Sequence, residues 1–151
     1  MKSLCNLGGL FNQRGAYEQA LAPLQRAREL DPLFPEALLN LATCQGERGE
    51  LEQAETLLRE AVAQRPHYAE AWFTLANVLH HRGQSQEAVD AYDRCLQLNP
   101  RHATALTNRG VKLGELGRHG EAETSHRASL ALQPANATAW YNLGNSLHKL
   151  Q

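Results

Sequence analysis

The sequence has few of the features that mark secreted, membrane-spanning or nucleic-acid-binding proteins. Its 151 residues include three cysteines, Cys5, Cys44 and Cys95. They are widely spaced and odd in number, so we predict free buried thiols rather than disulfides. No apolar run approaches the length of about 18 residues that a membrane span needs, and no signal-peptide pattern is present. The formal net charge of −1 gives no electrostatic case for nucleic acid or a membrane surface. Together these absences predict a reducing, cytoplasmic setting.

Motifs for catalysis are also missing. The sequence contains no glycine-rich phosphate loop, no two cysteines separated by two residues and no readable pairing of a nucleophile with a base. His80 and His81 are neighbours, so on a helix they point about 100° apart and do not converge on one metal ion. We therefore predict a protein that is not an enzyme and that binds no metal or cofactor.

What the sequence does contain is a pattern that recurs every 34 residues. Residues 69–102 show the unit: two amphipathic helical patterns, a turn at Gly83, which can take the positive φ that ends a helix, and a stop at Pro100. Shifting the sequence by this period aligns three residue types in four copies: Gly15, Gly49, Gly83 and Gly117; Ala20, Ala54, Ala88 and Ala122; Pro32, Pro66, Pro100 and Pro134.

The copies cover residues 1–34, 35–68, 69–102 and 103–136, and residues 137–151 repeat the first helix once more. Such helices are too short and too one-sided to be stable alone in water, so each must pack on its neighbours. Self-similarity at this period indicates a helical repeat array. We therefore predict one all-α domain, 1–151, made of four full repeats and one extra helix.

Residues within each copy are numbered here from its first residue. Position four is large, as in Trp72, whereas position eight is small, as in Ala76, which lets the two helices of a copy approach closely. The pattern resembles the tetratricopeptide repeat family over the whole chain, on these residues and their counterparts: Trp72, Leu75, Ala76, Leu79, Ala88, Tyr92 and Pro100. The resemblance implies a right-handed α-solenoid of antiparallel helix pairs with the first helices on its concave wall.

Some positions depart from this pattern, most of them in copy four. His126 stands where other copies have leucine or tyrosine, and Arg109 replaces a leucine, with an aliphatic stem that can pack while its head reaches water. Gly114 and Gly120 each cost about 1 kcal/mol relative to alanine inside a helix. We predict that copy four and the segment around Pro23, which interrupts a helical pattern, are the least stable parts.

Position six of the first helices is asparagine in four of five copies, the residues being Asn6, Asn40, Thr74, Asn108 and Asn142. Asparagine is a poor helix former, so we expect either a tolerated polar residue or a ladder that binds peptide backbone, since a carboxamide both donates and accepts. Packed helices lie roughly 8–10 Å apart, so one rung would meet about every third residue of an extended guest. The ladder is similar to the one in the tetratricopeptide region of O-linked N-acetylglucosamine transferases, which implies backbone binding by the four asparagines; Thr74 does not match.

Other side chains on the same predicted face add apolar and stacking contacts. The candidate peptide-binding residues besides position six are Phe73, Asn77, His80, Val111 and Tyr141. Leu39, Thr43 and Asn145 are expected beside them. A second binding mode of the family, a clamp for a terminal carboxylate, is rejected because Phe73, Thr138 and Asn142 occupy the positions that require cations.

These features predict a non-catalytic module that binds an extended segment of a protein or peptide in its concave groove. Two alternatives remain open. The chain could be the substrate-recognition segment of a larger enzyme, such as a glycosyltransferase similar to O-linked N-acetylglucosamine transferase, and we expect it to be part of a longer array. It could also be a self-assembling structural array, because Trp140, Leu143 and Leu147 lie on a helix without a partner and favour a homo-oligomer formed through the terminal helices.

Overall fold

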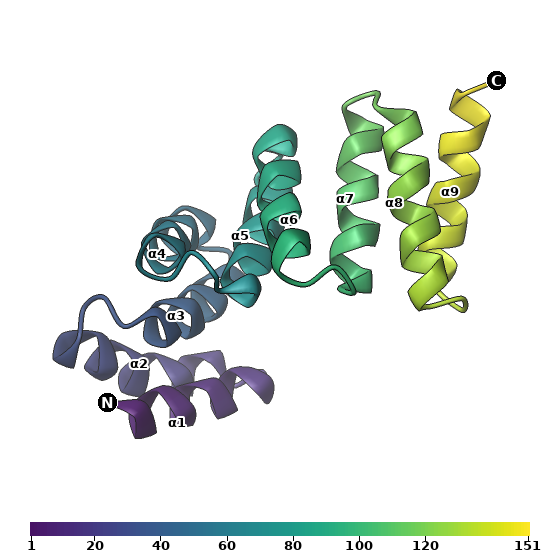
Figure 1. The fold of residues 1–151 in the computed structure, drawn as a ribbon. Helices are drawn as coiled ribbons and strands as arrows, with labels where there is room; N and C mark the ends of the chain where they lie inside the picture. The colour runs from purple at the N-terminus through teal and green to yellow at the C-terminus, as the bar shows by residue number, and fades with distance from the viewer. The chain divides into compact units, whose positions relative to one another are not determined.

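The computed structural model describes residues 1–151 and contains nine α-helices and no strand (Figure 1). The helices are α1 (Lys2–Gln13), α2 (Tyr17–Leu30), α3 (Pro35–Glu47), α4 (Leu51–Gln64), α5 (Ala69–His81), α6 (Ser85–Leu98), α7 (Ala103–Glu115), α8 (His119–Leu132) and α9 (Ala137–Lys149). Odd-numbered helices are the first helices of the copies and even-numbered ones the second, as the period predicts. None of them is long and apolar enough to cross a membrane.

The chain divides into two compact units, Met1–Val78 and Leu79–Gln151, whose boundary falls inside α5. In the N-terminal unit, α1 packs on α2 and α3, and α3 packs on α4. In the C-terminal unit, α6 packs on α7, and α7, α8 and α9 contact one another (Figure 1). Each unit therefore buries apolar faces that its single helices cannot bury alone.

Each first helix that is followed by a second one ends in the same way, at the glycine that the period aligns. Gly83 has a φ of 73°, a value that a residue with a Cβ rarely adopts. The next residue, Gln84, donates its backbone N–H to the Leu79 carbonyl over 3.0 Å, which closes the end of α5. Copies one, two and four repeat this bond from the residue after the glycine. The predicted turn is confirmed, because the glycine supplies a backbone conformation that the bond requires.

The core of the N-terminal unit pairs small residues with large ones. Leu24, Leu38 and Leu58 are fully buried. Gly8 of α1 lies so close to Leu24 of α2 that a Cβ built on it would meet Leu24 Cγ at 2.4 Å. A glycine at position eight therefore sets how closely α1 and α2 approach. Pro23 lies inside α2, which runs from Tyr17 to Leu30 without a break.

The core of the C-terminal unit is more polar than expected for an apolar stripe. Tyr92 and Leu113 are fully buried, but Thr107 and Ser129 are buried as well and share a hydrogen bond of 2.7 Å. Ser129 also donates to the Ala103 carbonyl over 3.0 Å. Because these polar groups bond to each other and to backbone, they cost little in the interior.

Arg109 differs from its predicted setting. Its side chain is largely buried, and its guanidinium forms an ion pair with Asp93 and donates to the buried Ser125. The head group is held inside the unit rather than in water, because two acceptors on α6 and α8 lie within its reach. The cysteines follow their prediction, since Cys5, Cys44 and Cys95 are all free and buried.

Candidate functional site

The structure places the predicted binding residues on first helices, in two separate groups. In the N-terminal unit, Asn6 is exposed on α1, whereas Asn40 on α3 is half-buried. The other members of this group are the half-buried residues Phe73, Thr74 and Asn77 of α5. In the C-terminal unit, the group consists of His80, Asn108, Val111 and Asn142, which are half-buried, and Tyr141, which is 70% exposed.

Two of the four position-six asparagines are engaged within the protein. Asn40 Nδ2 donates to the Cys5 carbonyl over 3.4 Å, and the Asn40 carbonyl accepts from Asn12 Nδ2 over 2.7 Å, so α1 and α3 are tied together here. Asn108 is hydrogen-bonded to the hydroxyl of the buried Tyr92. Burial raises the pKa of that phenol, and the bond from Asn108 opposes the rise. Asn40 and Asn108 therefore have a structural role in addition to any role in binding.

The other three position-six residues, Asn6, Thr74 and Asn142, differ in their hydrogen bonds. Asn6 and Asn142 make no side-chain hydrogen bond within the protein, so their carboxamides are available to a guest. The Thr74 hydroxyl donates to the Glu70 carbonyl one turn back over 2.9 Å. Among the position-six residues only Asn6 is exposed, whereas the others are half-buried: Asn40, Thr74, Asn108 and Asn142.

Leu39 is not on the groove surface as expected, because it is only 5% exposed. It occupies position five of α3, and the same position holds the buried residues Cys5 and Thr107 in other copies. Cys5 packs with Ala27 and Ala37, which shows that position five faces into the stack. Tyr141 occupies this position in α9, and it is exposed in a helix on which no further helix packs.

The outer face of α9 is apolar and open. Trp140 is 57% exposed, Leu147 36% and Leu150 52%, although the indole of Trp140 donates to the Pro134 carbonyl over 2.8 Å. The predicted exposure of this stripe is confirmed for Trp140 and Leu147, but Leu143 is buried against Leu130 and Ala139.

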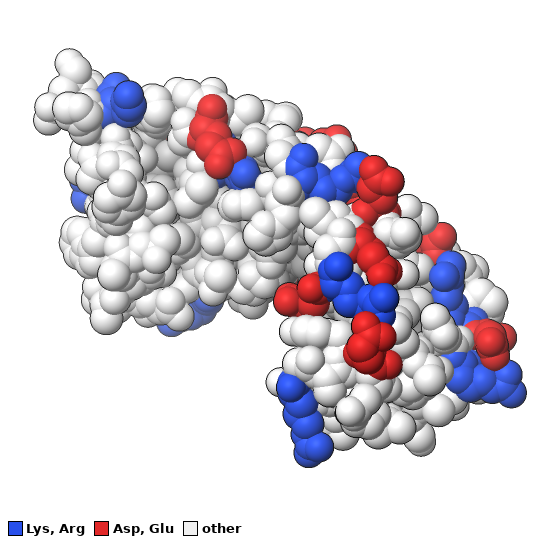
Figure 2. Space-filling model, turned by 180° about the vertical axis from the view of Figure 1, so that it is seen from behind, with Lys and Arg blue, Asp and Glu red and all other residues white.

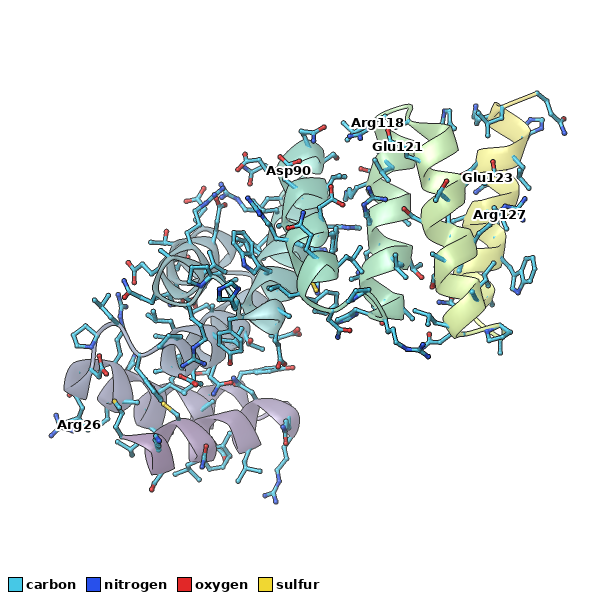
Figure 3. The ribbon with its side chains drawn as sticks, in the orientation of Figure 1. Arg26, Asp90, Arg118, Glu121, Glu123 and Arg127 are labelled. Atoms are coloured by element: carbon cyan, nitrogen blue, oxygen red, sulfur yellow. The ribbon has the colours of Figure 1, made fainter.

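The charged side chains are mostly paired with opposite charges. Figure 2 shows lysine and arginine beside aspartate and glutamate over one face, in mixed groups rather than a patch of one sign. Arg118 pairs with Glu121 over 2.7 Å at the start of α8, and Arg127 pairs with Glu123 over 2.8 Å further along the helix (Figure 3). Such exposed pairs contribute little to stability. They also provide no field that would attract one sign of ligand.

A cavity of about 320 Å³ opens between α7, α8 and α9. Its walls include Gly110, Gly114, His126, Asn142, Ser146 and Lys149. Glycine stands at positions eight and twelve of α7. The space beside Gly110 is filled by the ring of His126, whereas a Cβ on Gly114 would meet no atom within 4 Å. The structure thus brings Asn142 and Val111, both predicted binding residues, beside His126, which the sequence showed only as a departure from the repeat.

His126 is the unusual group in this cavity. It occupies the core slot that leucine fills in copies one and two, and it is only 1% exposed. Its Nδ1 atom has no hydrogen-bond partner. Burial lowers the pKa of the imidazole below its ordinary value, because charging it in the interior is costly. The sequence signal for this site was a polar residue at a core position, together with the glycines of copy four.

His126 predicts a loss of stability in mild acid. Its pKa is lower in the folded protein than in the unfolded chain, so the unfolded chain binds the proton more readily and stability falls as the pH drops below about 6.5. We expect the free energy of unfolding to decrease from pH 7.5 to 5.5, and to decrease less in His126→Leu. Urea unfolding at each pH measures this.

Two further groups define the control for that measurement. Burial, followed by Lys112 and His81, lowers the pKa of His80 as well, so part of the slope persists in His126→Leu. Gln53 of α4 is exposed and carries no titratable group, so Gln53→Leu should leave the slope unchanged. An identical slope in His126→Leu and the unmodified protein would contradict the prediction.

Comparisons with known proteins agree with the repeat geometry. Family models described as tetratricopeptide repeat match residues 11–61, 45–103, 82–125 and 107–151. A search of curated sequences returned no match.

Three similar solved structures share the fold at low sequence identity. MamA is 23% identical with a TM-score of 0.86, covering 94% of this chain and 83% of that chain. YrrB, described as a TPR protein with an unusual peptide-binding site, is 23% identical with a TM-score of 0.85, covering 96% and 75%. Pseudomonas aeruginosa PilF is 24% identical with a TM-score of 0.88, covering 99% and 68%. Since the family models match most of the chain and its helices pair as the repeat requires, the protein belongs to the tetratricopeptide repeat family.

Proposed function

We propose that this protein is a non-catalytic interaction module that binds an extended segment of a partner protein along its first helices. The observation that carries the proposal is the recurrence of asparagine at position six, with the free carboxamides of Asn6 and Asn142. A carboxamide can donate to a peptide carbonyl and accept from a peptide N–H at once. It therefore binds backbone without selecting the side chain of the guest.

Two further features support binding over catalysis. The buried thiols are unsuited to nucleophilic chemistry, since burial raises the pKa of Cys95 to about 11 and also raises that of Cys44. YrrB, which shares the fold, is described as having a peptide-binding site. These observations favour a guest peptide over a small-molecule substrate.

The test compares alanine variants of the free rungs against a peptide selected from a display library on the intact protein. Asn6→Ala and Asn142→Ala should each weaken binding, and together by about thirtyfold, because each variant loses a hydrogen bond worth about 1 kcal/mol. Isothermal titration measures the affinities. Asn108→Ala is a poorer choice, since it also removes the partner of the Tyr92 hydroxyl.

The matched control changes two glutamines on second helices. Gln19 of α2 and Gln53 of α4 are exposed and occupy one repeat position. Gln19→Ala with Gln53→Ala should leave the affinity unchanged. If the double variant Asn6→Ala with Asn142→Ala binds the peptide as tightly as the unmodified protein, the proposed role of these asparagines is wrong.

A further inference from the structure

We propose that the cavity between α7, α8 and α9 is a specificity pocket that receives one acidic side chain of the guest. This inference rests on the proposed function for the origin of the side chain, but the pocket itself rests on its own geometry. The cavity of about 320 Å³ is open on one side and is lined in part by Asn142, which the proposed ladder also uses. A guest held at Asn142 could thus place a neighbouring side chain in the cavity.

The shape of the cavity admits a side chain because its α7 wall is bare backbone. Gly110 and Gly114 both line it and lie about one helical turn apart. The Cβ that Gly110 lacks would meet the ring edge of His126, at 2.5 Å from Cε1. The imidazole edge that carries the unpartnered Nδ1 therefore packs on Gly110, and the open part of the cavity lies beside Gly114.

The charges around the cavity favour a carboxylate over a neutral or basic group. Lys149 lines it and makes no ion pair within the protein. The one acidic residue in the wall, Glu115, is bonded to Lys112 over 2.9 Å and to Ser85 over 3.0 Å. Hydrogen bonds from those two groups outweigh burial and lower the pKa of Glu115. The charge of Glu115 is thus compensated, whereas that of Lys149 is not.

The remaining polar groups are compatible with an anionic guest. Asn145 is exposed and offers an amide donor, whereas the one proton of the Ser146 hydroxyl is already donated to the Asn142 carbonyl over 3.0 Å. His119 adds a second imidazole at the start of α8. A carboxylate beside His126 would stabilise the imidazolium form, so its binding would be coupled to proton uptake by this ring.

The pocket can be tested with a small probe that is too short to reach two asparagines of the ladder. The probe is N-acetyl-L-glutamate N-methylamide, whose only carboxylate is on the side chain, and NMR of the histidine rings and backbone amides follows its titration. We expect shifts at His126, Gly114 and Lys149, and a rise in the measured pKa of His126. The glutamine counterpart of the probe should bind at least about tenfold more weakly, because it lacks the charge-assisted bonds.

Two variants localise the binding. Gly114→Leu should abolish it by filling the cavity, whereas Gly120→Leu on α8, which also meets no atom within 4 Å of its Cβ, should preserve it. Lys149→Gln, at an exposed position where folding is not at risk, should weaken binding about fivefold or more. Equal binding of the glutamate and glutamine probes, or unchanged binding by Gly114→Leu, would overturn the proposal.

Two comparisons test whether the carboxylate comes from a side chain or a chain end, and whether the pocket and the asparagine ladder act independently. N-acetylglycine carries a chain-terminal carboxylate, and binding as tight as that of the glutamate probe would overturn the assignment to a side chain. Suppose that a selected peptide binds Asn6→Ala more weakly than the unmodified protein, yet keeps its affinity when its own glutamates are replaced by glutamine. That result would support the proposed function and contradict the pocket. If the probe binds specifically but Asn6→Ala changes the affinity for no peptide, the pocket is supported and the asparagine ladder is contradicted.

Discussion

Tyr92→Ala is expected to lower the free energy of unfolding by about 3–5 kcal/mol, the largest effect of any single substitution considered. Tyr92 lies on α6 and has the largest volume of the fully buried side chains. Its hydroxyl is bonded to Asn108 of α7. Removing the ring leaves a cavity that the surrounding helices fill only in part, and it deprives Asn108 of its partner. Urea unfolding followed by circular dichroism measures the loss.

Two further variants test whether the loss comes from the buried ring, from its hydroxyl, or from removing any tyrosine. Tyr92→Phe keeps the ring and should cost about 1 kcal/mol, since the half-buried Asn108 can bond to water instead. Tyr141→Ala removes a tyrosine that is 70% exposed on α9 and should change stability by less than about 0.5 kcal/mol. Equal losses for Tyr92→Ala and Tyr141→Ala would contradict the packing argument.

Gly8→Ala should lower the free energy of unfolding by about 1–3 kcal/mol, although alanine is the better helix former. The added methyl group would meet Leu24 Cγ at 2.4 Å, and Leu24 is fully buried. The helices α1 and α2 must then separate or strain. Gly144→Ala is the matched control, because Gly144 occupies the same repeat position in α9 and its Cβ would meet nothing within 4 Å. It should raise stability by about 0.5–1 kcal/mol.

A second substitution tests whether the contact itself is responsible. Leu24→Ala alone should cost about 2–5 kcal/mol by opening a cavity. When Gly8→Ala and Leu24→Ala are combined, the methyl group added on α1 would enter the space that the leucine vacated. The double variant should therefore lose less than the sum of the two single losses. Additive losses would show that Gly8 and Leu24 do not constrain each other.

The binding surface was harder to derive from the sequence than the fold. Position six was recognised from the recurrence of asparagine, yet Asn40 and Asn108 turn inward to bond the Cys5 carbonyl and the Tyr92 hydroxyl. Leu39 lies one residue before Asn40 and is buried, although the helical pattern placed it on the same open face. A helical wheel assigns directions around one helix, but whether a direction meets solvent depends on the neighbouring helix.

The cavity shows the same limit at another site. Gly110 and Gly114 lie one helical turn apart on α7, whereas His126 lies on α8 and Lys149 on α9. Only the packing of these three helices brings the four residues to one cavity. From the sequence, Gly114 was interpreted as a cost to helix stability and His126 as a departure from the repeat. The space that they leave between helices depends on interhelical distances, which residue patterns do not contain.

Periodicity alone was sufficient for the helix pairs and for their turns at Gly15, Gly49, Gly83 and Gly117. These features depend on local backbone preferences and on apolar stripes, both of which are written in short stretches of sequence. The tertiary structure decided which asparagines remain free, where Arg109 places its charge, and that a cavity exists beside His126. Those outcomes depend on contacts between residues of different helices, where differences of an ångström determine whether a polar group is bonded, exposed or left without a partner.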